Sequence, residues 1–456
     1  MAGTLKADRA EQRAWYFYDW ANSAFYTIVV TVFAGPFLTD LARTAARAAG
    51  TGAVHPLGLT VAPAAWYPYL VSLSALLQVL LMPVVGALAD HSGRRRLLLG
   101  ALTAVGAAAT VAMVALGDAD YLAGGLLFLL ATVAFGCTIV VYNAWLPDIA
   151  SPAERDRVSS KGWAFGYLGG GLALAATLVV FQLAERGALP FGQGAAVRGC
   201  LAGAGLWWGG FTLVSLRRLR DRPVTGVEAG TVAGIASGAA PAVRAGFAQL
   251  RATLAGLRLA RMTLLFIAAY LLYDDGIQTV ISQSSVFATS ELGLATSTVI
   301  VAVLVVQFVA MVGAYAAGLL AERLGAKRVV LGTLVVWVVV LAWAYVLPAG
   351  QSGTFLLLAV LIGLVLGGSQ ALTRSLYSHM VPAGREAEYF SFYEIADRGT
   401  SWLGSLLFGL ALQFTGSYRL AIVSLLVFFV LGATLLLLTR VRVAIAEAGN
   451  PQPPRI

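Results

Sequence analysis

The stretch YFYDWANSAFYTIVV, residues 16–30, lies in a run of more than twenty mostly apolar residues and carries a carboxylate inside it. A run of about 20 apolar residues is long enough to cross the hydrocarbon core of a bilayer as a helix. Asp19 and Asn22 lie about one helical turn apart within it. A charged side chain at bilayer depth costs at least about 2.5–3.5 kcal/mol. This cost predicts a membrane helix whose polar face serves a function.

The composition extends this interpretation to the whole chain. Of its 456 residues, 59% are hydrophobic and 12% are charged, whereas soluble domains carry about 25% charged residues. The apolar runs are too long for the strands of a membrane barrel. We therefore expect an all-α membrane protein with twelve transmembrane helices near residues 14–40, 65–89, 96–116, 121–145, 158–184, 196–217, 262–288, 297–321, 328–347, 354–376, 387–413 and 419–439.

The basic residues predict the orientation. The net charge is +9, and Lys and Arg mark cytoplasmic loops of membrane proteins. With both termini inside, the cytoplasmic segments hold 25 of the 31 Lys and Arg residues. The bilayer thus explains the charge better than a nucleic-acid partner does. The first residues carry no signal-peptide core or cleavage site, which suits the cell (inner) membrane.

A long cytoplasmic segment separates two similar halves. Residues 218–261 include VTGVEAGTVAGIASGAAPA, which has the composition of a flexible linker. The end of the segment, residues 243–261, is either an amphipathic helix on the membrane surface or a plain basic linker. We expect six-helix bundles over residues 1–217 and 262–440, and a cytoplasmic tail over residues 441–456.

Three segments recur in the same order in both halves. YDWANS (18–23) parallels YDDGIQ (273–278), GALADHSGRRR (86–96) parallels GLLAERLGAKR (318–328), and LPDIASPAERDRVSS (146–160) parallels VPAGREAEYFS (381–391). Two parallel six-helix repeats are the architecture of major facilitator transporters.

The segment 86–96 resembles the loop signature of that superfamily, with an acidic residue, a glycine and two or three basic residues. In the family, the acidic residue and one Arg belong to a network that closes the inner gate. The resemblance assigns this role to Asp90 and Arg94, and in the second half to Glu322 and Arg323. His91 departs from the family pattern, which usually has Arg or Lys there.

Longer segments resemble a narrower branch. YDWANSAFYTIVVTVF, GWAFGYLGGG and YFSFYEIADRGTSWLGSLLFG are similar to the vacuole-effluxer branch, which includes autophagy-related vacuolar amino-acid permeases and bacterial members. The resemblance covers nearly the whole chain. It implies a secondary transporter that exports amino acids by alternating access; a monomer is the family default.

The polar residues concentrate in the spans that line the cavity in this superfamily. Asp19 and Asn22 share one helical face, and Asp274 is the counterpart of Asp19 in the aligned repeat. The Gly-rich stretch 162–171 predicts close helix packing. The candidate substrate or proton cavity residues of these spans are Tyr18, Asp19, Asn22, Tyr26, Asn143, Tyr273, Asp274, Asp275, Gln278 and Gln370.

The span near 387–413 adds a charged cluster. Glu394 and Arg398 are four residues apart and can pair on one helical face, and Asp397 lies beside Arg398. Arg398 either forms a structural ion pair or binds a substrate carboxylate bidentately. Burial favours the neutral form of a carboxyl group, so these acids permit coupling to protons.

The same features leave other functions open. A proton-coupled exporter of amphipathic cations or drugs fits the twin acids and aromatic residues, and other small metabolites stay open. The sequence has no HExxH, G-x-S-x-G or phosphate-binding loop, so we do not expect an enzyme. Cys137 and Cys200 are predicted to be packing residues, and we expect no metal site and no cofactor.

Overall fold

The computed structural model describes residues 9–149, 155–221, 260–381, 393, 402–450 and 452. In this part of the chain the regular structure is helical. Eleven helices are long and apolar enough to cross a membrane, and their positions match the predicted spans. The eleventh predicted span, 387–413, overlaps a shorter apolar helix, Leu403–Thr415. Its first part lies outside the described residues except for Tyr393.

Across the described residues the helices follow one another without a sheet. Those before the linker are α1 (Arg9–Ala24), η1 (Phe25–Phe33), α2 (Ala34–Ala49), η2 (Pro56–Gly58), α3 (Pro63–Ser92), α4 (Arg95–Ala112), η3 (Met113–Ala115), α5 (Tyr121–Asn143), α6 (Leu146–Ile149), α7 (Arg155–Glu185) and α8 (Gln193–Arg218). Those after it are α11 (Arg261–Ser290), α12 (Thr296–Leu324), α13 (Ala326–Val346), α14 (Ser352–His379), α16 (Leu403–Thr415), α17 (Tyr418–Ser424), α18 (Leu426–Leu438) and α19 (Val441–Glu447).

The chain divides into two compact units. The first holds residues 1–41 and 76–248, and the second holds residues 42–75 and 249–456. The break near residue 248 falls inside the predicted linker. Of residues 243–261, for which an amphipathic helix was one of two predictions, all except Ala260 and Arg261 lie outside the described part. The first part of α3, before Leu76, belongs with the second unit.

The first helical path, made of α1, η1 and α2, extends beyond the predicted span 14–40 at both ends. The helical path runs from Arg9 to Ala49 and changes to π-helix over Phe25–Phe33. The backbone N–H of Ala34 donates to the Val29 carbonyl, five residues back, which is the hydrogen-bond spacing of a π-helix. Short π-helical turns are frequent at functional sites, and this one directly follows the polar face of Asp19 and Asn22.

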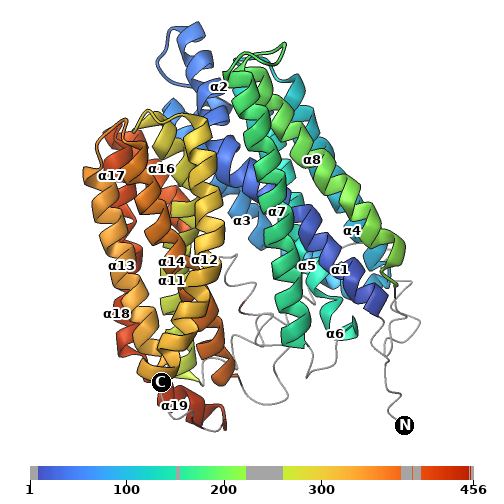
Figure 1. Cartoon of the computed structure of the whole chain (residues 1–456), viewed down its shortest axis with the longest axis vertical. Helices are drawn as coiled ribbons and strands as arrows, with labels where there is room; N and C mark the ends of the chain where they lie inside the picture. Colours follow the sequence, from blue (N-terminus) through green and yellow to red (C-terminus); the bar gives the residue numbers. More distant parts are fainter. Residues whose placement is uncertain are drawn as a thin grey trace. The chain divides into compact units, whose positions relative to one another are not determined.

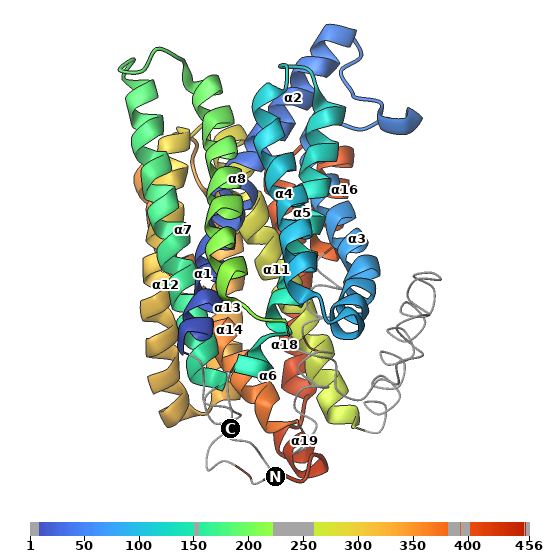
Figure 2. The same cartoon turned by 90° about the vertical axis from the view of Figure 1, so that its right-hand side faces the viewer.

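Unit 1 packs α1 against α7 and α8, and α4 against α5 and α8. Figure 2 shows α4 and α5 running alongside each other. Trp208 of α8 is fully buried, with its ring 5.0 Å from that of Phe25. Gly106 of α4 leaves the space for the Trp208 ring, because a Cβ at residue 106 would overlap it.

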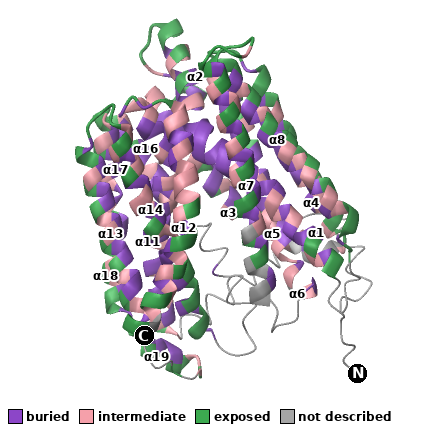
Figure 3. Cartoon of the chain, viewed as in Figure 1, coloured by how far each residue is buried: buried purple, intermediate pink, exposed green. Residues whose placement is uncertain are grey.

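Unit 2 packs α12 against α14, and α11 against α18 (Figure 1). Gly313 and Gly367 let the backbones of α12 and α14 approach closely, since a Cβ at either would overlap a main-chain oxygen of the other helix. Exposed residues lie along α13 and α18 (Figure 3), and they include apolar side chains such as Val335 and Leu437. Exposed apolar faces of this kind suit contact with lipid.

Segment 42–75 makes hydrogen bonds to the rest of unit 2. The Tyr67 hydroxyl donates to the Ser282 carbonyl at 3.2 Å, and the Ser72 hydroxyl donates to the Trp402 carbonyl at 3.0 Å. Gly409 of α16 accommodates the Tyr69 ring, which would lie 2.7 Å from a Cβ there. These contacts join the first half of α3 to α11 and α16.

Candidate functional site

The first acidic site lies in unit 1, where three helices meet around Asp19. The Tyr142 hydroxyl, from the end of α5, donates to Asp19 Oδ2 at 2.7 Å. The Tyr142 ring stacks on Trp15 with centroids 4.3 Å apart, and Trp15 Nε1 donates to the Tyr142 carbonyl at 3.0 Å. Trp15 and Asp19 are one turn apart on α1, so this helix holds Tyr142 at both its ring and its backbone.

Two glycines of α7 let this helix approach the acid. A Cβ on Gly162 would lie 2.7 Å from both Asp19 Oδ2 and the Trp15 ring. A Cβ on Gly166 would lie 2.8 Å from the Ser23 hydroxyl and 3.5 Å from the Asp19 Cβ. The prediction that this stretch packs closely is consistent with these distances. The glycines face the polar side of α1.

The second acidic site lies in unit 2, on α11. Asp274 and Asp275 are both buried, with 4% and 2% of their surface exposed. The backbone N–H of Gly404, at the start of α16, donates to Asp275 Oδ2 at 2.8 Å. Asp274 accepts a longer hydrogen bond, 3.4 Å, from the Gln278 amide on its own helix. The two neighbouring acids therefore face different partners.

The two sites repeat one packing arrangement. In unit 1, Gly166 of α7 covers Asp19 and the hydroxyl of Ser23, four residues on. In unit 2, Gly404 of α16 covers Asp275 and the hydroxyl of Thr279, again four residues on; a Cβ there would overlap Thr279 Oγ1 and lie 3.0 Å from Asp275 Oδ1. By packing, Asp275 occupies the place of Asp19, although the sequence repeat aligned Asp19 with Asp274.

Aromatic residues surround the α11 site on its α14 side. The hydroxyls of Tyr273 and Thr373 lie 2.6 Å apart. Tyr393 stacks on Tyr270 at 4.5 Å and on Tyr377 at 4.8 Å. Rings with a polar end combine an apolar body with a hydrogen-bonding group, which suits a pocket for a small polar solute.

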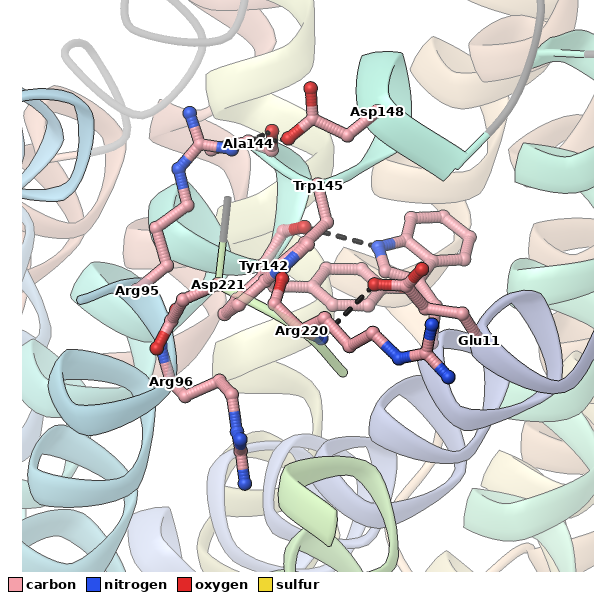
Figure 4. Close-up of polar contacts among 10 residues, drawn as sticks. Glu11, Arg95, Arg96, Tyr142, Ala144, Trp145, Asp148, Arg220 and Asp221 are labelled. Atoms are coloured by element: carbon pink, nitrogen blue, oxygen red, sulfur yellow. Dashed lines mark hydrogen bonds and ion pairs between the residues drawn. The ribbon is translucent and has the colours of Figure 1, made fainter. Parts of the chain in front are cut away.

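A polar network lies at the predicted cytoplasmic end of unit 1 (Figure 4). Arg95 forms an ion pair with Asp148 at 2.7 Å and donates to the Ala144 carbonyl at 2.8 Å. The Arg220 backbone N–H donates to Glu11 at 3.0 Å, and the Arg220 carbonyl accepts from Trp145 Nε1 at 3.2 Å. The start of the interdomain segment is thereby held against α1 and the turn after α5.

The structure describes the predicted gate residues only in part. Arg94 is exposed and lies just before α4, while its neighbour Arg95 makes the ion pair described above. Arg323 is exposed in the last turn of α12. Asp90 and Glu322 lie on α3 and α12, but their side chains are outside the described part of the structure. The gate role of these four residues stays a prediction.

The predicted cavity residues fall into three groups. Tyr18, Asn22 and Tyr273 are buried, and Tyr26, Asn143, Gln278 and Gln370 are half-buried. Glu394, Asp397 and Arg398 lie outside the described residues, so the choice between an ion pair and a substrate ligand at Arg398 stays open. In the described part, no three His, Cys, Asp or Glu residues gather to hold a metal ion.

Sequence reasoning missed several contributors. Trp15 was not singled out because a tryptophan near the start of a membrane helix ordinarily indicates interfacial anchoring. Thr279 was overlooked, although it lies four residues after Asp275, as Ser23 does after Asp19. That repeated spacing was the available signal. Arg95 could not be separated from Arg94 and Arg96 by sequence alone.

Comparisons with known proteins extend these observations. A family model described as "Vacuole effluxer Atg22 like" matches residues 7–449. A Bacillus subtilis protein named "Uncharacterized MFS-type transporter YxiO" is 29% identical over 95% of this chain and 95% of its own length. Autophagy-related protein 22-1 of Aspergillus niger is 25% identical over 85% of this chain and 75% of its own length.

Solved structures show the same fold. A D-xylose-proton symporter matches with a TM-score of 0.62 at 14% identity, over 94% of this chain and 95% of its own. A bacterial homologue of the human lysosomal transporter Spinster, inward-facing and unoccupied, matches with a TM-score of 0.63 at 14% identity, over 99% of this chain and 100% of its own. The chain therefore belongs to the Atg22-like vacuole-effluxer family and is a secondary transporter of the major facilitator superfamily.

Proposed function

We propose that this transporter exports amino acids or closely related zwitterions by alternating access, with coupling to protons. The observation that carries the proposal is a buried or partly buried carboxyl group on α1 and again on α11, each within a polar cluster. An amino acid presents one ammonium and one carboxylate. The acids on α1 and α11 match the ammonium, and Arg398 is the proposed partner of the carboxylate.

The mechanism would be rocking of residues 1–217 against residues 262–440 around one central site. The proposed gate residues are Asp90, Arg94, Glu322 and Arg323. The placement that suits the charge distribution is the cell membrane with both termini in the cytoplasm, and we propose that the protein acts as a monomer. The name of the Aspergillus relative concerns autophagy and gives no substrate.

Counterflow in proteoliposomes tests the substrate class. Vesicles loaded with an unlabelled amino-acid mixture should transiently accumulate external labelled leucine, tyrosine or lysine. Vesicles with the Asp19→Asn, Asp274→Asn double variant serve as a matched comparison for coupling. Absence of accumulation for all three labels would contradict the amino-acid assignment.

A second candidate is a proton-coupled exporter of amphipathic cations. The stacked Trp15 and Tyr142 rings beside Asp19 favour it, because aromatic faces and a carboxylate together attract organic cations. A bound cationic dye distinguishes the two candidates. Displacement of the dye by neutral amino acids supports the first, whereas dye transport that amino acids do not inhibit supports the second.

A further inference from the structure

Residues 142–148 comprise the end of α5, the two-residue turn after it and the start of α6, and they contact the acidic site at one end and α4 at the other. The first of them, Tyr142, bonds Asp19 through its hydroxyl. The last, Asp148, bonds Arg95, the first residue of α4. Between them, the Ala144 carbonyl accepts from Arg95, and Trp145 donates to the Arg220 carbonyl. We call residues 142–148 the relay segment.

We propose that Tyr142 is a positioning residue that passes the charge state of Asp19 through the relay segment to Arg95 and the start of the interdomain segment. The inference rests on the proposed coupling to protons and adds to it a route from the acid to the gate. Coupling between sites requires contacts with two discrete arrangements. The Tyr142 hydroxyl supplies such a contact.

The hydroxyl can serve both forms of the acid. A tyrosine O–H donates to an ionised carboxylate, and the same oxygen can accept from a protonated one. A charge-assisted hydrogen bond is shorter and stronger than a neutral one. Protonation of Asp19 therefore lengthens or rotates its contact with Tyr142, while Trp15 still holds the carbonyl of that residue.

The surroundings of Asp19 leave this contact as its main partner in the described structure. From α7 it meets Gly162 and Gly166, while Lys161 and Tyr167 of that helix are exposed. On its own helix, the buried side chains Tyr16, Tyr18 and Asn22 lie nearby.

From α8, the group next to this part of α1 is Trp207, which donates to the Trp20 carbonyl at 3.2 Å and does not titrate. Tyr142 is the titratable group that α5 contributes. The Tyr142 hydroxyl donates to the Asp19 carboxylate and so compensates part of its charge.

The far end of the relay segment is placed to respond. Tyr142 and Ala144 are two residues apart, and their carbonyls accept from Trp15 and Arg95 respectively. The helix stops here, since the two residues after Asn143 form a turn before α6. A small rotation of Tyr142 is thus transmitted to the Ala144 carbonyl, which accepts from Arg95, and to the Trp145 indole, which donates to the Arg220 carbonyl.

The test measures accessibility and needs no substrate. Leu219 is fully buried beside the Arg220 contact, so a Leu219→Cys variant, with Cys137→Ser and Cys200→Ser, reports opening of this region. A maleimide labels this cysteine, and each rate is divided by the thiolate fraction at that pH. The corrected rate should change by about tenfold between pH 5.5 and 8.5, which is the size of effect expected from a hydrogen bond to a charged group.

Three substitutions in that background decide the matter. Asp19→Asn should hold labelling at the low-pH rate at every pH. Tyr142→Phe, which keeps the ring and its stacking, should remove the pH dependence. Trp145→Phe should remove it while leaving the Asp19–Tyr142 contact in place, and covers the case in which Tyr142→Phe does not fold. Tyr167→Phe is the matched control and should behave as the parent.

A pH dependence that survives both Tyr142→Phe and Trp145→Phe would overturn the relay, even if amino-acid transport is confirmed. A pH dependence that survives Asp19→Asn would overturn the role of the acid. If no tested solute is transported, the labelling result stands by itself, so failure of the proposed function and failure of the relay are distinguishable.

Discussion

The Asp19 site of unit 1 and the Asp275 site of unit 2 share one packing arrangement but differ in the group that bonds the acid. Asp19 accepts from a side-chain hydroxyl on another helix. Asp275 accepts from a backbone N–H at the first turn of α16. A hydroxyl can donate or accept, whereas a backbone N–H can only donate.

This difference assigns the two acids different tasks. A group that only donates is satisfied by an ionised carboxylate, and the start of a helix favours negative charge. Asp275 is therefore suited to hold the first turn of α16 against α11. Asp19, with a partner that serves both protonation states, is suited to exchange a proton. Asp274 resembles Asp19 in this respect, because the Gln278 amide that bonds it carries both a donor and an acceptor.

The largest predicted effect separates the acids by replacing each with Asn. Asp19→Asn and Asp274→Asn should each reduce the stimulation of transport by a pH gradient by about tenfold or more, since an amide cannot carry the proton. Both variants should retain counterflow. Asp275→Asn should lower both activities together, because it weakens a structural bond. Proteoliposome uptake with and without a pH gradient measures this. Uncoupling by Asp275→Asn alone would reverse the assignment.

The membrane spans were the most predictable part of the fold. The predicted span 262–288 corresponds to helix α11, Arg261–Ser290, and the predicted span 121–145 corresponds to helix α5, Tyr121–Asn143. The length of an apolar run is fixed by the bilayer, so these limits follow from composition. Polar residues such as Arg43 ended the predicted first span, but the helix continues to Ala49. Hydropathy predicts how far an apolar run extends, but the point at which a helix ends also depends on local packing.

The acidic site was predicted in its residues more than in its contacts. Sequence placed Asp19 on a polar face but could not identify Tyr142 as its partner, because they are 123 residues apart. The aligned repeats paired Asp19 with Asp274. Asp274 and Asp275 are adjacent, so their side chains leave the helix about 100° apart. The contact with Gly404 is what identifies Asp275, and not Asp274, as the equivalent of Asp19 in packing. Arg95 is likewise selected over Arg94 by the turn before α4.

The next effect concerns the glycines that cover the acids. A methyl group on Gly404 would overlap the Thr279 hydroxyl and lie 3.1 Å from the Asp275 main-chain oxygen. On Gly166 it would meet the rotatable Ser23 hydroxyl, and the nearest Asp19 main-chain oxygen is 3.6 Å away. Gly404→Ala should therefore cost about 1–3 kcal/mol of stability through overpacking, and Gly166→Ala less.

Thermal unfolding of the purified variants in detergent measures this difference. Gly171→Ala is the control, because nothing lies within 4 Å of a Cβ there and Ala is a better helix former than Gly. It should leave the midpoint unchanged or raise it. Equal losses for Gly404→Ala and Gly166→Ala would show that α16 yields as easily as α7 does, and would remove the rigid role assigned to Asp275.

The smallest effect tests the two hydroxyls that accompany the acids. Buried threonines elsewhere, such as Thr110 and Thr212, donate to the carbonyl four residues back. Thr279 Oγ1 is buried but has no hydrogen-bond partner in the described structure. Thr279→Val and Ser23→Ala should then change stability by no more than about 0.5 kcal/mol.

Thr373→Val is the matched contrast, because the Thr373 hydroxyl lies 2.6 Å from that of Tyr273. This substitution should cost about 1–3 kcal/mol of stability. If Thr279→Val costs as much as Thr373→Val, the Thr279 hydroxyl has a partner. If it lowers transport at unchanged stability, that hydroxyl contacts the solute, and the α11 site binds as well as supports.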